Sequence, residues 1–335
     1  MDFRTVCGIV IGPKQVNYVL LQRRKNNVLL LGAAFYEFSF DRQDEFKDIV
    51  ASIEGFLPKN TLTNISVIHP ETIEHLFLYD SNVANVRANI YRDLKNSYEI
   101  NLSDYLIDYE EFEVSGKKVA FVNALPKYVF DLFYTAFKDH KKLCLFSLET
   151  PVVSLRRVVN EFCRKYADVL VFNMCDEFSR IFALKGYNII VNRQVQGGFS
   201  SILKDMEREG GITEEEAKKL IYDRGFSDKD LDDEQKKAFY MSLSESFDRF
   251  SIEIQRTLDY LISVQKMGGV ESICTLGFAS SIKNVDKYLS KMFSMKAESL
   301  KLKKEIEFAD EVDFSIVEDM LYFDICIGAA LRRVG

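Results

Sequence analysis

Three apolar runs follow one another near the middle of the chain, at Val169–Phe172, Phe178–Leu184 and Tyr187–Val195. Lys185-Gly186 lies between the last two runs, so the pattern predicts a β-hairpin that leads into a third strand. Gly197-Gly198 follows, and after it apolar residues recur at helical spacing. A helix that begins there presents backbone N–H groups beside the first turn of the hairpin, which is an arrangement suited to a phosphate.

The first forty residues repeat this plan. Three apolar runs occur at Val6–Ile11, Val16–Leu21 and Val28–Phe40, with turns at Gly12-Pro13-Lys14 and Lys25-Asn26-Asn27. Aligning Gly12 with Cys175 gives an offset of 163 residues. An offset of this length is typical of a duplicated domain and not of a short tandem repeat. We therefore expect two lobes of related topology.

The periodicity predicts further elements around these two units. Strands are expected at Ile65–Ile68, Tyr105–Val114, Lys118–Ala124, Lys142–Leu148 and Ser272–Leu276. Helices are expected at Asp44–Phe56, from Ser81 to Leu94, from Pro126 to Phe137, from Thr150 to Phe162, at Ser244–Lys266 and at Asp324–Leu331. Thr213-x-x-Glu216 has the pattern of a capping box, which marks one more helix start.

The composition narrows the class of protein. With 335 residues, 47% of them hydrophobic, the chain is long enough for two domains with a large core. Its net charge of −7 argues against a nucleic acid as partner. The six cysteines form no CxxC pair and are interpreted as reduced core residues. No run reaches the roughly 18 apolar residues of a membrane span, so we expect no direct membrane insertion.

Two of the three histidines lie close together in the sequence. His69 precedes Pro70, and His75 follows six residues after His69. Two histidines without a third ligand are more often a turn residue and a surface residue than a metal site. We therefore predict no metal site.

Segments spread along the whole chain resemble one superfamily. They are the two strand-turn-strand units, Gly197-Gly198, the helix around Ser251–Leu258, the strand and turn Cys274–Ala279, and the ending Gly328–Arg332. Together they resemble actin-like proteins, and most of all the cytoplasmic type IV pilus assembly protein PilM. That family is related to the division protein FtsA and to the cytoplasmic part of the type II secretion protein GspL.

The resemblance implies a fold and a domain organisation. The fold is α/β, actin-like and two-lobed, made by duplication of an RNase H-like unit, with a small inserted α+β subdomain. The first lobe is expected at 1–165, with the inserted subdomain at about 81–148. The second lobe is expected at 166–335, with a helical subdomain at about 210–268.

The resemblance also marks where a nucleotide would bind. In actin-like ATPases two glycine-bearing turns clasp the phosphates, and an acidic residue at each turn organises Mg²⁺ and the attacking water. By this resemblance the residues that contact a nucleotide, if one binds, are Gly12, Lys14, Asn173, Gly197, Gly198 and Gly277.

Both turns depart from the family pattern. Val10 stands where the first acidic residue is expected, and Pro13 removes a backbone N–H group from the phosphate nest. Asn173 stands at the second acidic position, and Cys175 replaces an expected glycine. Because Mg²⁺ depends on carboxylates, we predict no catalytic residues, no metal, and either no cofactor or weakly bound ATP.

The leading hypothesis is a cytoplasmic scaffold of a type IV pilus or related secretion machine. By resemblance its partner is a bitopic inner-membrane protein like PilN, whose N-terminal tail binds between the first lobe and the inserted subdomain and brings the scaffold to the membrane. Self-association into a homo-oligomer stays open. The competing hypotheses are a nucleotide-binding actin-like ATPase with an atypical phosphate site, a sugar-kinase-like phosphotransferase and an FtsA-like division protein.

Overall fold

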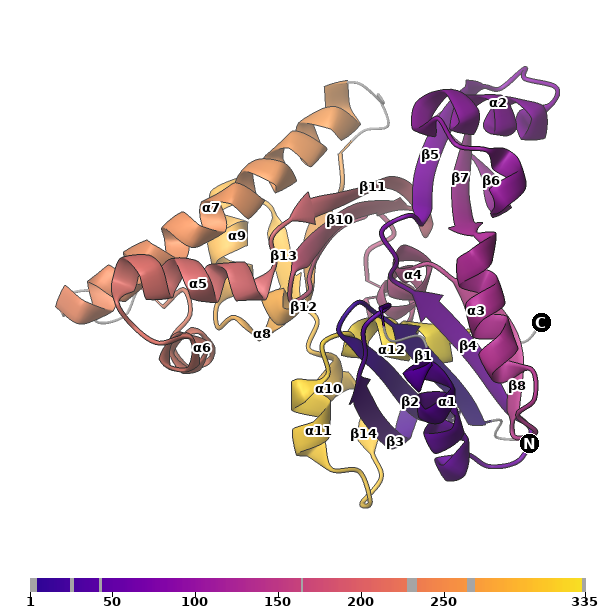
Figure 1. Ribbon diagram of the computed structural model, residues 1–335. Coiled ribbons are helices and arrows are strands. Elements are labelled where there is room, and N and C mark those ends of the chain that lie inside the picture. Colours follow the sequence, from indigo (N-terminus) through magenta and orange to yellow (C-terminus); the bar gives the residue numbers. More distant parts are fainter. Residues whose placement is uncertain are drawn as a thin grey trace. The chain divides into compact units, whose positions relative to one another are not determined.

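A computed structural model describes residues 5–24, 27–41, 44–163, 165–227, 234–263 and 269–332 (Figure 1). The chain divides into two compact units. Unit 1 comprises Met1–Phe162 and Leu302–Gly335, and unit 2 comprises Cys163–Lys301. Part of the turn predicted at Lys25-Asn26-Asn27 and the last residues of the helix predicted at Ser244–Lys266 lie outside the described residues.

Unit 1 is built on a six-stranded sheet. Its strand order is β14 (Glu307–Phe308), β3 (Val28–Glu37), β2 (Gln15–Arg23), β1 (Thr5–Ile11), β4 (Thr61–Val67) and β8 (Leu143–Glu149). The first three strands of the chain form an antiparallel meander, and β4 pairs with β1 in parallel. These strands agree with the apolar runs read from the sequence.

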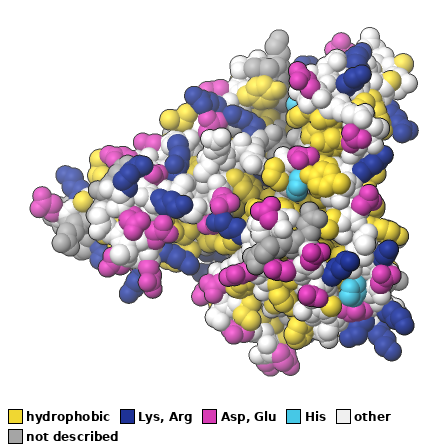
Figure 2. All heavy atoms as spheres, in the orientation of Figure 1, with side chains coloured by type: hydrophobic (Ala, Val, Ile, Leu, Met, Phe, Trp, Pro, Cys, Tyr) yellow, Lys and Arg dark blue, Asp and Glu magenta, His cyan; other side chains and the backbone are white. Residues whose placement is uncertain are grey.

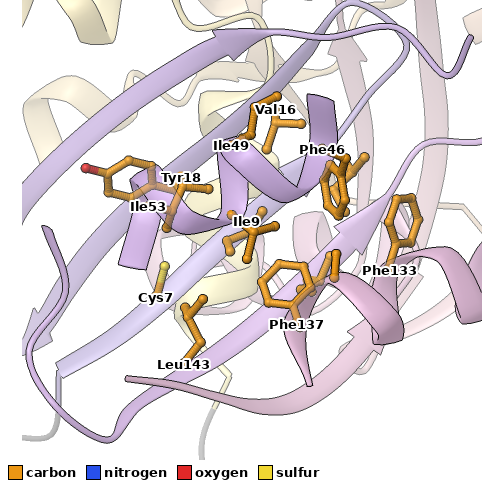
Figure 3. Packing of buried hydrophobic residues seen from close by; sticks show 14 of the residues in the cluster. Cys7, Ile9, Val16, Tyr18, Phe46, Ile49, Ile53, Phe133, Phe137 and Leu143 are labelled. Carbon is orange, nitrogen blue, oxygen red and sulfur yellow. The ribbon is translucent and has the colours of Figure 1, made fainter. Parts of the chain in front are cut away.

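The main core of unit 1 lies between this sheet and two helices, α1 (Glu45–Phe56) and α3 (Lys127–Phe137) (Figure 3). Alternate residues of β1, such as Cys7 and Ile9, point into this core because successive side chains of a strand face opposite sides. Phe46 of α1 packs against Phe133 and Phe137 of α3, with ring centroids 5.1 and 6.0 Å away.

A smaller three-stranded sheet is inserted between β4 and α3. Its order is β5 (Ile73–Asp80), β7 (Lys117–Pro126) and β6 (Tyr105–Val114), and α2 (Val86–Tyr98) covers one face. This sheet has its own core, formed by Ile73, Phe77, Val86, Ile90, Leu94, Ala120, Val122 and Ala124. Strand β5 was not predicted, and α2 is capped by Asn85, whose Oδ1 accepts from the Ala88 amide, instead of by Ser81.

The bounds predicted for the inserted subdomain, about 81–148, need correction to about 73–126. Helix α3 belongs to the main core, because Val129, Phe133 and Phe137 pack there. Strand β8 is the edge of the six-stranded sheet, paired in parallel with β4. The sequence pattern could not show this, because the apolar pattern of a helix or of a strand does not depend on which sheet the element joins.

The C-terminal segment also departs from its predicted place. The second lobe was expected to run to residue 335, but Leu302–Gly335 clusters with unit 1. This segment contains α10 (Leu302–Glu305), β14, α11 (Phe314–Asp319) and α12 (Phe323–Ala330). Strand β14 pairs with β3, and α12 packs against β1 and α4 (Pro151–Phe162).

Unit 2 repeats the plan of unit 1. Its sheet has the order β11 (Asn188–Gln196), β10 (Phe178–Lys185), β9 (Val169–Met174), β12 (Ser272–Gly277) and β13 (Lys296–Ser299). Again the first three strands form an antiparallel meander, and the next strand pairs with the first in parallel. The first hairpin turn even keeps the offset of 163 residues, since the Gly12 amide donates to the Gln15 carbonyl and the Cys175 amide to the Phe178 carbonyl, both at 3.0 Å.

Helices of unit 2 begin after Gly197-Gly198 and at Thr213 as predicted, whereas the long helix begins at Glu234, ten residues before the predicted start at Ser244, and the turn of helix at Phe278 was not predicted. The helices are α5 (Phe199–Gly210), α6 (Glu214–Asp223), α7 (Glu234–Ser263), the single turn α8 (Phe278–Ser281) and α9 (Val285–Phe293). The capping box is present, with Thr213 Oγ1 accepting from the Glu216 amide and the Glu216 carboxylate from the Thr213 amide. Phe247 and Phe250 of α7 pack against Phe172 of the sheet.

Candidate functional site

The predicted nucleotide residues of unit 1 lie in the tight turn between β1 and β2. Gly12 is buried under Tyr322, since a Cβ added at Gly12 would lie 2.3 Å from the Tyr322 ring. The Leu321 amide donates to the Gln15 side chain at 3.2 Å and holds the same segment over the turn. Gly12 therefore has a packing role that needs no phosphate.

The other residues of this turn offer little to a metal or a phosphate. Val10 is completely buried and carries no donor or acceptor in its side chain. Lys14 is exposed at the tip of the turn, and its carbonyl accepts from the Phe38 amide at 2.9 Å. Among the residues predicted to contact a nucleotide, Lys14 is the one with a positively charged side chain.

Unit 2 brings its four predicted residues together at the carboxyl ends of β9 and β12. A Cβ added at Gly277 would lie 2.9 Å from Asn173 Nδ2, and one added at Gly198 would lie 2.4 Å from the Cys175 carbonyl. Gly197 has a φ of +86°, which favours glycine. The buried Asn173 accepts from the Cys175 thiol through Oδ1 at 3.3 Å.

The start of α5 is already occupied by backbone hydrogen bonds. The Phe199 amide donates to the Cys175 carbonyl at 2.9 Å, and the Ser200 amide to the Asp176 carbonyl at 3.0 Å. A phosphate would have to displace these bonds to use the first amides of the helix. The glycine pair thus allows α5 to begin against the hairpin turn, which is a packing role that needs no phosphate.

Among the described residues there is no group of three or more His, Cys, Asp or Glu side chains placed to hold a metal ion. None of the described helices is both long and apolar enough to span a membrane.

A different surface of unit 1 gathers partly exposed aromatic side chains. We call it the aromatic surface and define it as Phe40, His69, Tyr105 and Tyr128. It lies where the connections leading to α1 and β5, the start of β6 and the start of α3 meet, between the six-stranded and the three-stranded sheets. Figure 2 shows hydrophobic side chains gathered beside a histidine on this face.

His69 is at the centre of the aromatic surface. Its ring lies 5.0 Å from that of Phe40 and 5.9 Å from that of Tyr128. The Glu71 amide donates to Nδ1 at 3.2 Å, so a neutral ring carries its proton on Nε2, which lies 3.4 Å from the Tyr128 hydroxyl. Burial lowers the pKa of His69, with the Glu71 charge opposing, which favours this neutral form.

Acidic side chains border the aromatic surface. Segment 73–126 carries nine Asp or Glu and five Lys or Arg residues. Burial, followed by the charges of Glu71 and Asp104, raises the pKa of Tyr105. The aromatic surface is therefore suited to a ligand with apolar anchors and positive charge. The sequence alone did not identify it, because its residues come from two connections, a strand and a helix that are separated in the sequence.

Acidification should destabilise unit 1 through His69 and His75, which are partly buried. Burial lowers the pKa values of His69 and His75 below 6.5, so the unfolded chain binds these protons more readily than the folded protein. The stabilisation is present above about pH 6.5 and is lost as the pH falls through the folded values. We expect urea titrations to show a smaller free energy of unfolding at about pH 5 than at about pH 7. Replacing both histidines with Gln should flatten this dependence; an unchanged slope would contradict the assignment.

Comparison with solved structures agrees with the fold predicted above. The chain is similar to a structure described as the "PilM-PilN type IV pilus biogenesis complex", with 13% identity, 97% of each chain covered and a TM-score of 0.68. It is also similar to the ethanolamine utilization protein EutJ from Carboxydothermus hydrogenoformans, with 11% identity, 99% of this chain and 90% of that chain covered, and a TM-score of 0.52.

These comparisons confirm the predicted actin-like α/β fold and the resemblance to PilM. At such low identities the likeness concerns the fold. No protein-family model matches the chain, and no curated protein matches it in sequence.

Proposed function

We propose that this chain is a cytoplasmic adaptor of a type IV pilus or related secretion machine, and that it binds the short cytoplasmic tail of a PilN-like inner-membrane protein. The observation that carries the proposal is the aromatic surface beside the inserted three-stranded sheet, in a chain of which 97% is similar to a structure described as a PilM-PilN complex. The partner brings the adaptor to the inner membrane.

The chemistry of such a tail fits the aromatic surface. Cytoplasmic segments next to a membrane span are rich in Lys and Arg, which the carboxylates of Glu71 and Asp104 attract. Apolar residues of the tail pack against Phe40 and Tyr128, and large aromatic side chains carry much of the energy of such interfaces. Strands β5 and β6 are the edges of the three-stranded sheet, so an extended tail can also pair with backbone groups.

We expect Tyr128→Ala to weaken tail binding about tenfold or more, because a large exposed aromatic side chain within an interface is a typical hot spot. The ligand is a synthetic peptide of the N-terminal cytoplasmic tail of a candidate PilN-like membrane protein from the same organism, and the measurement is isothermal titration calorimetry. Tyr187→Ala is the matched control, because Tyr187 has a similar exposure, 46% against 52%, and lies in unit 2. Equal affinity of both variants would contradict the proposed surface.

The whole inserted sheet can be removed as a second test. Because Ile73 pairs with Ala124 in the β5–β7 ladder, the ends of segment 73–126 are close and a short Gly-Ser linker can join them. Deleting 81–148 instead would remove α3 and β8 from the main core. The shorter deletion should abolish recruitment to membranes that contain the partner. The rest of unit 1 should still unfold cooperatively.

The adaptor role needs no ATP hydrolysis. We expect calorimetry to show weak or absent ATP binding and no Mg²⁺-dependent turnover above background, because Val10 and Asn173 provide no carboxylate for the metal. Tight ATP binding, or turnover that Lys14→Ala abolishes, would instead support the competing atypical ATPase. Tail binding should be the same with and without ATP.

A further inference from the structure

The end of unit 1 where α1 and α3 finish carries a concentration of lysines. We call it the basic end and define it as Lys59, Lys138, Lys141 and Lys142 together with Phe56. Figure 2 shows Lys and Arg side chains gathered at the lower right, near a histidine, where Figure 1 draws the connection from α3 to β8. The whole chain has a net charge of −7, so this end differs in sign from the molecule as a whole.

Hydrogen bonds hold the two segments of the basic end together. The carboxylate of Glu54, near the end of α1, accepts from the Lys142 amide at 2.8 Å and lies 2.6 Å from His140 Nδ1. The Thr61 amide donates to the Lys142 carbonyl at 2.9 Å, which places Lys59 beside the connection that carries Lys141. The Glu54 carboxylate thus positions the loop at 138–142. In the ranges 54–61 and 138–142, Asp139 is the other acidic residue.

Phe56 is the most exposed large hydrophobic residue among those described, with 69% of its surface accessible. A single exposed apolar residue is ordinary on a protein surface. Here, however, Phe56 is the last residue of α1, two positions after Glu54 and three before Lys59. An exposed aromatic side chain at the same end of unit 1 as several lysines is the combination that adsorbs to the interface of an anionic membrane.

We propose that the basic end binds the surface of a membrane that contains anionic lipids. The lysines contact lipid headgroups, and Phe56 enters the interface between headgroups and acyl chains. This contact is independent of the proposed tail binding, although a tail that holds the adaptor at the membrane would raise the local concentration and make a weak lipid affinity sufficient.

The charge distribution favours a membrane over a nucleic acid. A flat membrane meets this end of unit 1, whereas the rest of the chain is acidic on average and repels a long polyanion. Single-stranded nucleic acids are bound by several aromatic side chains in succession, and the basic end contains one.

The test uses the purified full-length chain without any partner. Sedimentation with vesicles compares phosphatidylcholine alone with an equal mixture of phosphatidylcholine and phosphatidylglycerol. We expect binding to the anionic vesicles, weakened by salt, and little to the neutral ones. Lys138→Gln with Lys141→Gln should lower the partition coefficient about 25-fold, as each lysine near an anionic surface contributes roughly a factor of five.

Lys218→Gln with Lys219→Gln on α6 is the matched control, because it makes the same change in net charge at exposed positions. Phe56→Ser should lower vesicle binding about tenfold, and Ile262→Ser, at a residue 60% exposed on α7, should not. Equal binding to both kinds of vesicle, or equal loss in the two lysine pairs, would overturn the proposal. Single-stranded DNA that binds more tightly than vesicles, through the same lysines and unaffected by Phe56→Ser, would assign the basic end to a nucleic acid instead.

Discussion

Gly8→Ala is expected to destabilise unit 1 by about 3 kcal/mol or more. A Cβ at this position of β1 would lie 2.2 Å from the Cys326 carbonyl oxygen and 2.6 Å from the Ala330 amide nitrogen. Both neighbours are backbone atoms of α12, so no side-chain rotation relieves the clash and the helix itself must move. The free energy of unfolding from urea titration, followed by circular dichroism, measures the effect.

Gly55→Ala provides a control of opposite sign. Gly55 lies in α1, and an added Cβ there would meet no atom within 4 Å. Alanine has the higher helix propensity, so this variant should be more stable by up to about 1 kcal/mol. A Gly8→Ala protein as stable as the parent would show that α12 does not pack against β1 as described.

Glu149→Gln is expected to cost about 3 kcal/mol, because it removes the charge shared by two arginines. The Glu149 carboxylate is buried, accepts from two nitrogens of Arg157, and lies 3.0 Å from Arg332 Nη1 and 2.5 Å from Ser154 Oγ. These contacts join the end of β8 to α4 and to the end of α12. Without the carboxylate the partly buried Arg157 guanidinium loses its counter-charge.

The matched control is Glu307→Gln. Glu307 pairs with Arg24 at 3.3 Å, and both side chains are close to half exposed. Exposed ion pairs contribute about 1 kcal/mol or less, so this variant should unfold nearly as the parent does. Similar losses in the two variants, measured by the same urea titration, would contradict a special role for Glu149.

Local chemistry determined most of the secondary structure of this protein. Apolar runs gave the strands of both meanders, and the Thr213 and Glu216 pair marked the start of α6 correctly. The duplication was visible in the sequence because equivalent turns lie 163 residues apart. In the folded protein the two turns make the same hydrogen bond. These features depend on residues near in sequence, so pattern and turn chemistry are sufficient to predict them.

Tertiary structure alone decided which sheet each element joins. The hydrophobic stripe of α3 has the same pattern whether it packs on the inserted sheet or on the main core. The contacts of its phenylalanines with Phe46 show that it packs on the main core. In the same way, β14 belongs to unit 1 because it pairs with the edge of β3. Helix α12 belongs there because Gly8, which has no side chain, lets the helix backbone approach β1 closely. The aromatic surface and the basic end also arise only in the folded chain, since His69 and Tyr128, or Lys59 and Lys141, are far apart in sequence and become neighbours when their connections meet.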